Sequence, residues 1–64
     1  MHSKQQALCA LMEDNFYSVG VIHATLALLS HSNELLDEMI VYIEDCHPTE
    51  NQIIEKTADL IKQC

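Results

Sequence analysis

Residues 34–46 read ELLDEMIVYIEDC, and this stretch decides the fold class because its apolar and acidic residues recur with the period of an α-helix. At about 100° per residue, the large apolar side chains share one side of the helix and the carboxylates share the other. The apolar side carries Leu35, Leu36, Met39, Ile40, Tyr42, Ile43 and Cys46, whereas the acidic side carries Glu34, Asp37, Glu38, Glu44 and Asp45. Val41 projects from the middle of the acidic side. The pattern predicts an amphipathic helix over about 34–46, capped by Ser32 or Asn33.

The segment that follows predicts another helix. Pro48 ends the preceding helix, and Thr49 with Gln52 has the spacing of a capping box. We expect a helix over about 50–63 whose apolar face buries Ile53, Ile54, Thr57, Leu60, Ile61 and Cys64.

The segment that precedes residues 34–46 is an unusually apolar helix over about 18–30, with Ser18 as its N-cap. One face carries large side chains, namely Val19, Val21, Ile22, Leu26, Leu28 and Leu29. The opposite face carries the small residues Gly20, Ala24 and Ala27. Such a helix is enclosed from both sides or lies at a self-association surface, and we expect His23 to be a core or interface residue.

A first helix over about 4–14 completes the pattern, because Ala7, Leu8, Leu11 and Met12 share one face. Phe16 and Tyr17 follow it, and we expect these aromatic side chains to close one end of a small core. The fold class predicted for residues 1–64 is therefore all-α: a single domain formed by a compact bundle of four short helices, about 4–14, 18–30, 34–46 and 50–63.

Charge and composition restrict the partners. The chain has ten acidic residues, three lysines and no arginine, for a net charge of −7. Phosphates and anionic lipid surfaces repel such a protein, so we expect neither a nucleic acid nor a membrane as partner. The longest nearly apolar run, 19–29, is too short to span a bilayer. Three cysteines cannot all pair within one chain, and no apolar leader opens the sequence, so we expect a cytoplasmic location.

No residue pattern typical of catalysis or cofactor binding stands out. Cys46 and His47 are neighbours in sequence, but a helix directs their side chains apart, and we expect Cys46 to pack as a small hydrophobe. His23 and His31 lie eight positions apart, which is too far for a pair of metal ligands on one helix face. A single glycine cannot build a phosphate-binding loop. We therefore expect no metal, no cofactor and no enzymatic activity.

Residues 7–43 resemble the helical modules of the ubiquitin-associated family. The resemblance lies mainly in 21–43, where an Ala/Leu-rich helix meets a short polar turn containing Asn33 and then a helix with paired apolar positions. It implies a similar helical arrangement. The family's Met-Gly-Phe/Tyr contact loop would correspond to Asn15–Ser18, which reads Asn-Phe-Tyr-Ser and departs from that motif.

Three hypotheses for function follow. The first is a protein-interaction or homo-oligomerising module that uses Gly20, Ala24 and Ala27. The second is an acidic mimic or inhibitor that binds a basic protein through the acidic residues 34–45 around Val41. The third is a ubiquitin-associated-like binder. All three are non-enzymatic, and each names a protein or a second copy of the chain as the partner.

Overall fold

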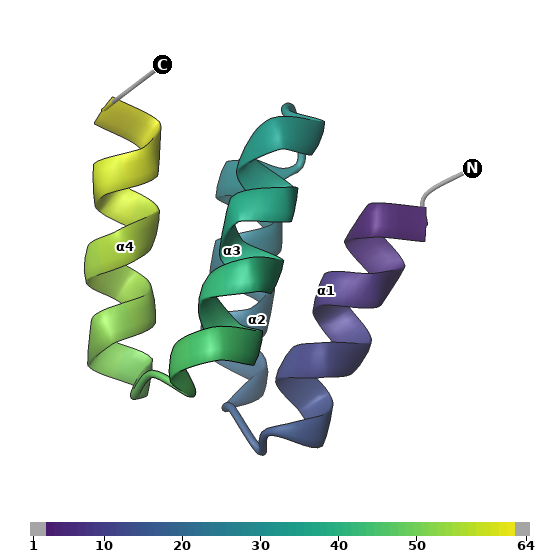
Figure 1. Ribbon diagram of the computed structural model, residues 1–64, viewed down its shortest axis with the longest axis vertical. Coiled ribbons are helices and arrows are strands. Elements are labelled where there is room, and N and C mark those ends of the chain that lie inside the picture. The colour runs from purple at the N-terminus through teal and green to yellow at the C-terminus, as the bar shows by residue number, and fades with distance from the viewer. Residues whose placement is uncertain (1–2, 63–64) are drawn as a thin grey trace.

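The computed structural model describes residues 3–62, which form four helices joined by short loops (Figure 1). The helices are α1 (Ser3–Asp14), α2 (Val19–Leu29), α3 (Asn33–Cys46) and α4 (Glu50–Lys62). The predicted all-α bundle is confirmed. Each predicted helix boundary lies within one residue of the observed one, except that position 63 lies outside the described residues, as does Cys64, for which burial is predicted.

The predicted caps set the starts of three helices. The hydroxyl of Ser18 accepts a hydrogen bond from the Val21 N–H, and the hydroxyl of Ser32 accepts one from the Leu35 N–H. At α4, the Thr49 N–H donates to Oε1 of Gln52 at 2.9 Å, and the Gln52 N–H donates to Oγ1 of Thr49 at 3.2 Å. These bonds satisfy N–H groups that the first turn of a helix leaves without partners, so local sequence alone fixes where α2, α3 and α4 begin.

Helices α2 and α3 form the centre of the bundle. Helix α1 packs against α3 and α2, and α4 packs against α2 and α3, whereas α1 and α4 do not touch. Figure 1 shows α1 and α4 on opposite sides of α3, with α2 behind it, and it shows α2 and α4 running in the same direction. The core is shared by all four helices. Its buried members are Leu8, Met12, Ile22, Leu29, Leu35, Leu36, Met39, Ile43, Ile53 and Leu60.

Two hydrogen bonds join the α1–α2 loop to the segment that begins α4, and we call this pair the loop clasp. The hydroxyl of Tyr17 donates to the carbonyl oxygen of Pro48, and the Ser18 N–H donates to Oε2 of Glu50 at 2.6 Å. The second bond is charge-assisted, which makes it stronger than a neutral one. The loop clasp holds the N-terminal ends of α2 and α4 side by side.

The expectation that both aromatic residues close the core is wrong for Phe16. The Tyr17 N–H donates a hydrogen bond to the carbonyl of Met12 just after the end of α1. Between these two residues the chain makes a left-handed turn, with Phe16 at φ 65°. This turn directs Phe16 outward, where it is 92% exposed, and brings Tyr17 inward against the core. Only one of two adjacent aromatic residues is therefore used for packing.

Candidate functional site

Three large apolar side chains assigned by the sequence to buried helix faces are exposed instead. Val19 is 67% exposed, Leu28 is 48% exposed and Ile54 is 54% exposed. On both α2 and α4, the apolar face is wider than the part that is buried in the core. The buried residues are Ile22, Thr25 and Leu29 on α2, and Ile53, Thr57 and Leu60 on α4. The surplus apolar surface faces solvent.

Leu28 and Ile54 belong to an apolar groove of about 320 Å³ between α2 and α4, which we call the α2–α4 groove. Gly20, Val21, Ala24, Thr25 and Leu28 line it from α2, and Ile54, Thr57, Ala58 and Ile61 line it from α4. None of these residues is charged. The hydroxyl of Thr57 donates to the carbonyl of Ile53 at 2.8 Å, so this polar group is already satisfied within its own helix. The groove is thus suited to an apolar rather than a polar ligand.

The small face predicted for α2 is exposed in the single chain, so α2 is not enclosed from both sides. Gly20 and Ala24 line the α2–α4 groove, while Ala27 is exposed outside its lining. A side-chain carbon added at Gly20 would meet no atom within 4 Å, which leaves open space above this position. No Asp, Glu, Lys or Arg occurs between residues 15 and 33, so the α2 wall is free of formal charge.

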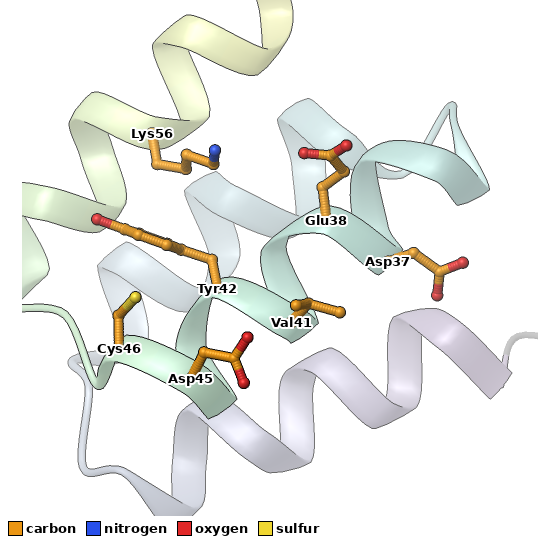
Figure 2. Close-up of a pocket in the computed structure, with 7 residues that line it drawn as sticks. All are labelled: Asp37, Glu38, Val41, Tyr42, Asp45, Cys46 and Lys56. Carbon is orange, nitrogen blue, oxygen red and sulfur yellow. The ribbon is translucent and has the colours of Figure 1, made fainter.

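A second hollow, of about 490 Å³, lies over α3, and we call it the α3 pocket. Figure 2 shows its seven lining residues: Asp37, Glu38, Val41, Tyr42, Asp45 and Cys46 from α3, and Lys56 from α4. Val41 is 54% exposed and lies between Glu38 and Asp45, as the sequence predicts. The Lys56 ammonium lies 5.3 Å from the centre of the Tyr42 ring, which is within range of a cation–π interaction.

Only some of the acidic residues predicted as a contact surface lie together in the structure. Asp37, Glu38 and Asp45 line the α3 pocket, whereas Glu34 and Glu44 are exposed outside its lining. Asp37 also forms an ion pair with Lys4 of α1. With Lys4 beside Asp37 and Lys56 over Tyr42, the chain's own lysines partly neutralise this surface.

The expectation that Cys46 packs as a small hydrophobe is wrong, because Cys46 is exposed in the last turn of α3. Of the two alternatives for His23, the core position is wrong, because His23 is exposed in the single chain, and the interface position stays a prediction. Both lie on the solvent side of helices whose opposite sides fill the core.

The side chains of His47 and Tyr17 contact loop residues, namely Asn15 and Pro48. His47 follows α3 in the left-handed conformation, and its Nδ1 lies 3.4 Å from Oδ1 of Asn15. Burial, and then the Glu50 and Tyr42 side chains, raise the pKa of Tyr17 above the ordinary tyrosine value. Within residues 3–62, no group of three potential ligand side chains is arranged to hold a metal ion.

Sequence reasoning found Gly20 and Ala24 of the α2 wall, but it assigned Leu28 to the opposite face of α2 and missed the α4 wall. Ile54, Ala58 and Ile61 follow the spacing i, i+4, i+7, which is also the spacing of a core face. The usable signal is Ile53 beside Ile54: adjacent positions diverge by about 100° on a helix, so a helix at the edge of the bundle does not bury both, whereas the central α3 buries both Leu35 and Leu36.

Comparison with known proteins adds no relative: no family model, curated protein or solved structure matches this chain. None of the helices between residues 3 and 62 has the length and apolar character needed to cross a membrane.

Proposed function

We propose that this chain is a non-enzymatic protein-interaction module that binds an apolar helix face in the α2–α4 groove. The observation that supports this most is the groove itself, because its whole lining is uncharged and Leu28 and Ile54 are about half exposed at its edges. Full burial of a leucine or isoleucine side chain is worth about 1.5–3 kcal/mol, so covering these two contributes about 1 kcal/mol each.

The shape of the groove favours a helix as the ligand. Its two walls are helices that run side by side. Lining residues follow one another at intervals of three or four along each helix, as Gly20, Ala24 and Leu28 do on α2. Small residues such as Ala24 and Ala58 allow close approach, while Leu28 and Ile54 form ridges. Ridges of one helix pack into grooves of another in the commonest helix–helix contacts of globular proteins.

The experiment is photo-crosslinking in the cell that naturally makes the protein, with benzoylphenylalanine introduced at Leu28. A matched position, Ala10 on the exposed side of α1, lies outside both hollows. We expect protein adducts from Leu28 that are absent from Ala10. Adding Ala58→Glu should abolish them because a carboxylate would lose its water in the groove, whereas Ala10→Glu should leave them unchanged. Equal adducts from both positions, or none from either, would contradict the proposal.

A second candidate function is binding of a basic protein surface through the α3 pocket. It is favoured by the exposed Val41, which lies between the carboxylates of Glu38 and Asp45 and gives the pocket an apolar centre with an acidic rim. The double charge reversal Glu38→Lys with Asp45→Lys tests it. Capture of basic proteins should be lost in this variant and kept in a variant with Glu34→Lys and Glu44→Lys, which lie outside the pocket; equal capture would eliminate this candidate.

A further inference from the structure

We infer that the α2–α4 groove binds the same groove of a second copy of this chain, in an antiparallel arrangement with Leu28 of each copy over Gly20 of the other. This inference rests on the proposed function and names the partner for the same site. It follows from the distribution of charge, from the spacing of three residues along α2 and from the surface available.

Charge distribution favours the α2 side of the molecule for self-association. Two copies with a net charge of −7 each repel one another wherever their acidic surfaces meet. All ten acidic residues lie outside the span 15–33, so α2 and the loops at both its ends carry none. A contact centred on α2 therefore keeps most of the acidic residues away from the interface. The exposed carboxylates nearest in sequence to the groove lining are Glu55 and Asp59, which follow Ile54 and Ala58 on the α4 wall.

The spacing along α2 makes this face complementary to itself. Gly20, Ala24 and Leu28 follow one another at intervals of four and all line the groove. A two-fold axis through Ala24, perpendicular to the helix, places position 28 of one copy over position 20 of the other. Leu28 provides the protruding side chain, and Gly20 provides open space with no atom within 4 Å of an added carbon. The antiparallel direction also opposes the two helix dipoles favourably.

The molecule is large enough for a contact of the size that a specific dimer needs. A specific interface buries at least about 1,000 Å² in total, or about 500 Å² from each copy. This is roughly one eighth of the 4202 Å² exposed by one chain. The molecule extends 27 × 27 × 22 Å, so a single face can supply that area.

The first test is sedimentation equilibrium of the purified full chain between about 1 μM and 1 mM. The first side-chain carbon of Gly20→Leu meets no neighbour in the single chain, and the rest of the leucine occupies the space into which Leu28 of the second copy projects. We expect Gly20→Leu to raise the dimer dissociation constant at least about tenfold, because Leu28 is displaced at both ends of the contact. Ala10→Leu adds comparable bulk on exposed α1 and should leave the constant unchanged. Equal constants for both variants and the wild type would overturn the inference.

The second test distinguishes the antiparallel arrangement from other dimers. Gly20→Glu and Leu28→Lys should each weaken self-association, since each puts a charge against an uncharged partner surface. In a mixture, the introduced carboxylate and ammonium meet at one end of the heterodimer and the native pair remains at the other. We expect mixed dimers with a dissociation constant at least about tenfold below that of either variant alone. A mixture that associates no better than its components would overturn the arrangement.

The two proposals fail in different ways. A wild-type chain that stays monomeric at about 1 mM overturns the second-copy inference. In that case, a Leu28 adduct with a different protein in the crosslinking experiment would retain the proposed function, and the absence of any Leu28-specific adduct would overturn it as well.

Discussion

Replacing Tyr17 with phenylalanine removes one hydroxyl from the loop clasp while keeping the ring that packs against the core. The hydroxyl donates to the carbonyl of Pro48, a buried residue of the loop that precedes α4. A net hydrogen bond is worth about 0.5–1.5 kcal/mol, and a buried acceptor left without a partner costs about 1–3 kcal/mol. Because Pro48 is buried but lies close to solvent-exposed Thr49, we expect Tyr17→Phe to lower the free energy of unfolding by about 1–2 kcal/mol.

The assay is urea denaturation followed by circular dichroism at neutral pH, with thermal unfolding as a second measurement. For a domain of this size, 1 kcal/mol corresponds to a shift in Tm of roughly 4–8 °C. Tyr42→Phe is the matched control, because the Tyr42 hydroxyl makes no hydrogen bond to another protein group within residues 3–62 and its loss should cost less than about 0.5 kcal/mol. If Tyr17→Phe proves as stable as the wild type, or if both variants lose the same amount, the loop clasp does not support the fold as argued.

The same hydroxyl predicts a pH dependence. Burial, followed by Glu50 and Tyr42, raises the pKa of Tyr17 in the folded chain, so folding favours the protonated form. The unfolded chain loses this proton near pH 10, and the stabilisation is fully present below that pH. It is lost as the pH rises from about 10 through the folded-state pKa. We therefore expect the stability advantage of wild type over Tyr17→Phe to be constant from neutral pH to about pH 9 and to fall above pH 10. A constant advantage up to about pH 11.5 would contradict this.

Three further predictions concern the core, α2 and the surface. Met39 is fully buried on α3, so Met39→Ala should lower the free energy of unfolding by about 2–5 kcal/mol in denaturant titrations, enough to unfold much of a domain this small. A loss below about 1 kcal/mol would show that Met39 is not in the core. Gly20→Ala should raise the stability of the dilute single chain by up to about 1 kcal/mol, because the added carbon meets no neighbour and alanine favours the helix; destabilisation would show that Gly20 is already covered. Lys4→Ala should cost less than about 1 kcal/mol, because its ion pair with Asp37 is solvent-exposed, and the difference should shrink in about 1 M salt; a larger, salt-independent loss would indicate a packing role.

Much of the fold was predictable because its determinants are local. Ser18, Ser32 and the Thr49–Gln52 pair define helix starts within a few residues of sequence, and Pro48 defines a stop. The clean separation of faces on α3 also identified its buried side, including Met39. Such features depend on the backbone and on helical period, neither of which requires knowledge of the neighbouring helix.

What the sequence did not determine is which part of a broad apolar face reaches the core. Ile53 is buried and adjacent Ile54 is half exposed, because α2 and α3 cover only one side of α4. Phe16 and Tyr17 differ in burial because the left-handed turn at residue 16 decides which ring points inward. The α4 wall of the groove was missed because a surface-exposed apolar strip and a buried one have the same spacing.

The most direct test that the α2–α4 groove is the contact surface is an isotope-filtered NMR experiment on a mixture of labelled and unlabelled chain at about 1 mM, which detects only contacts between copies. We expect intermolecular signals from the Leu28 methyl groups to the Gly20 α-protons and between the Ala24 methyl groups. Intermolecular signals confined to α1 or α3, or none at all, would contradict self-association through the groove.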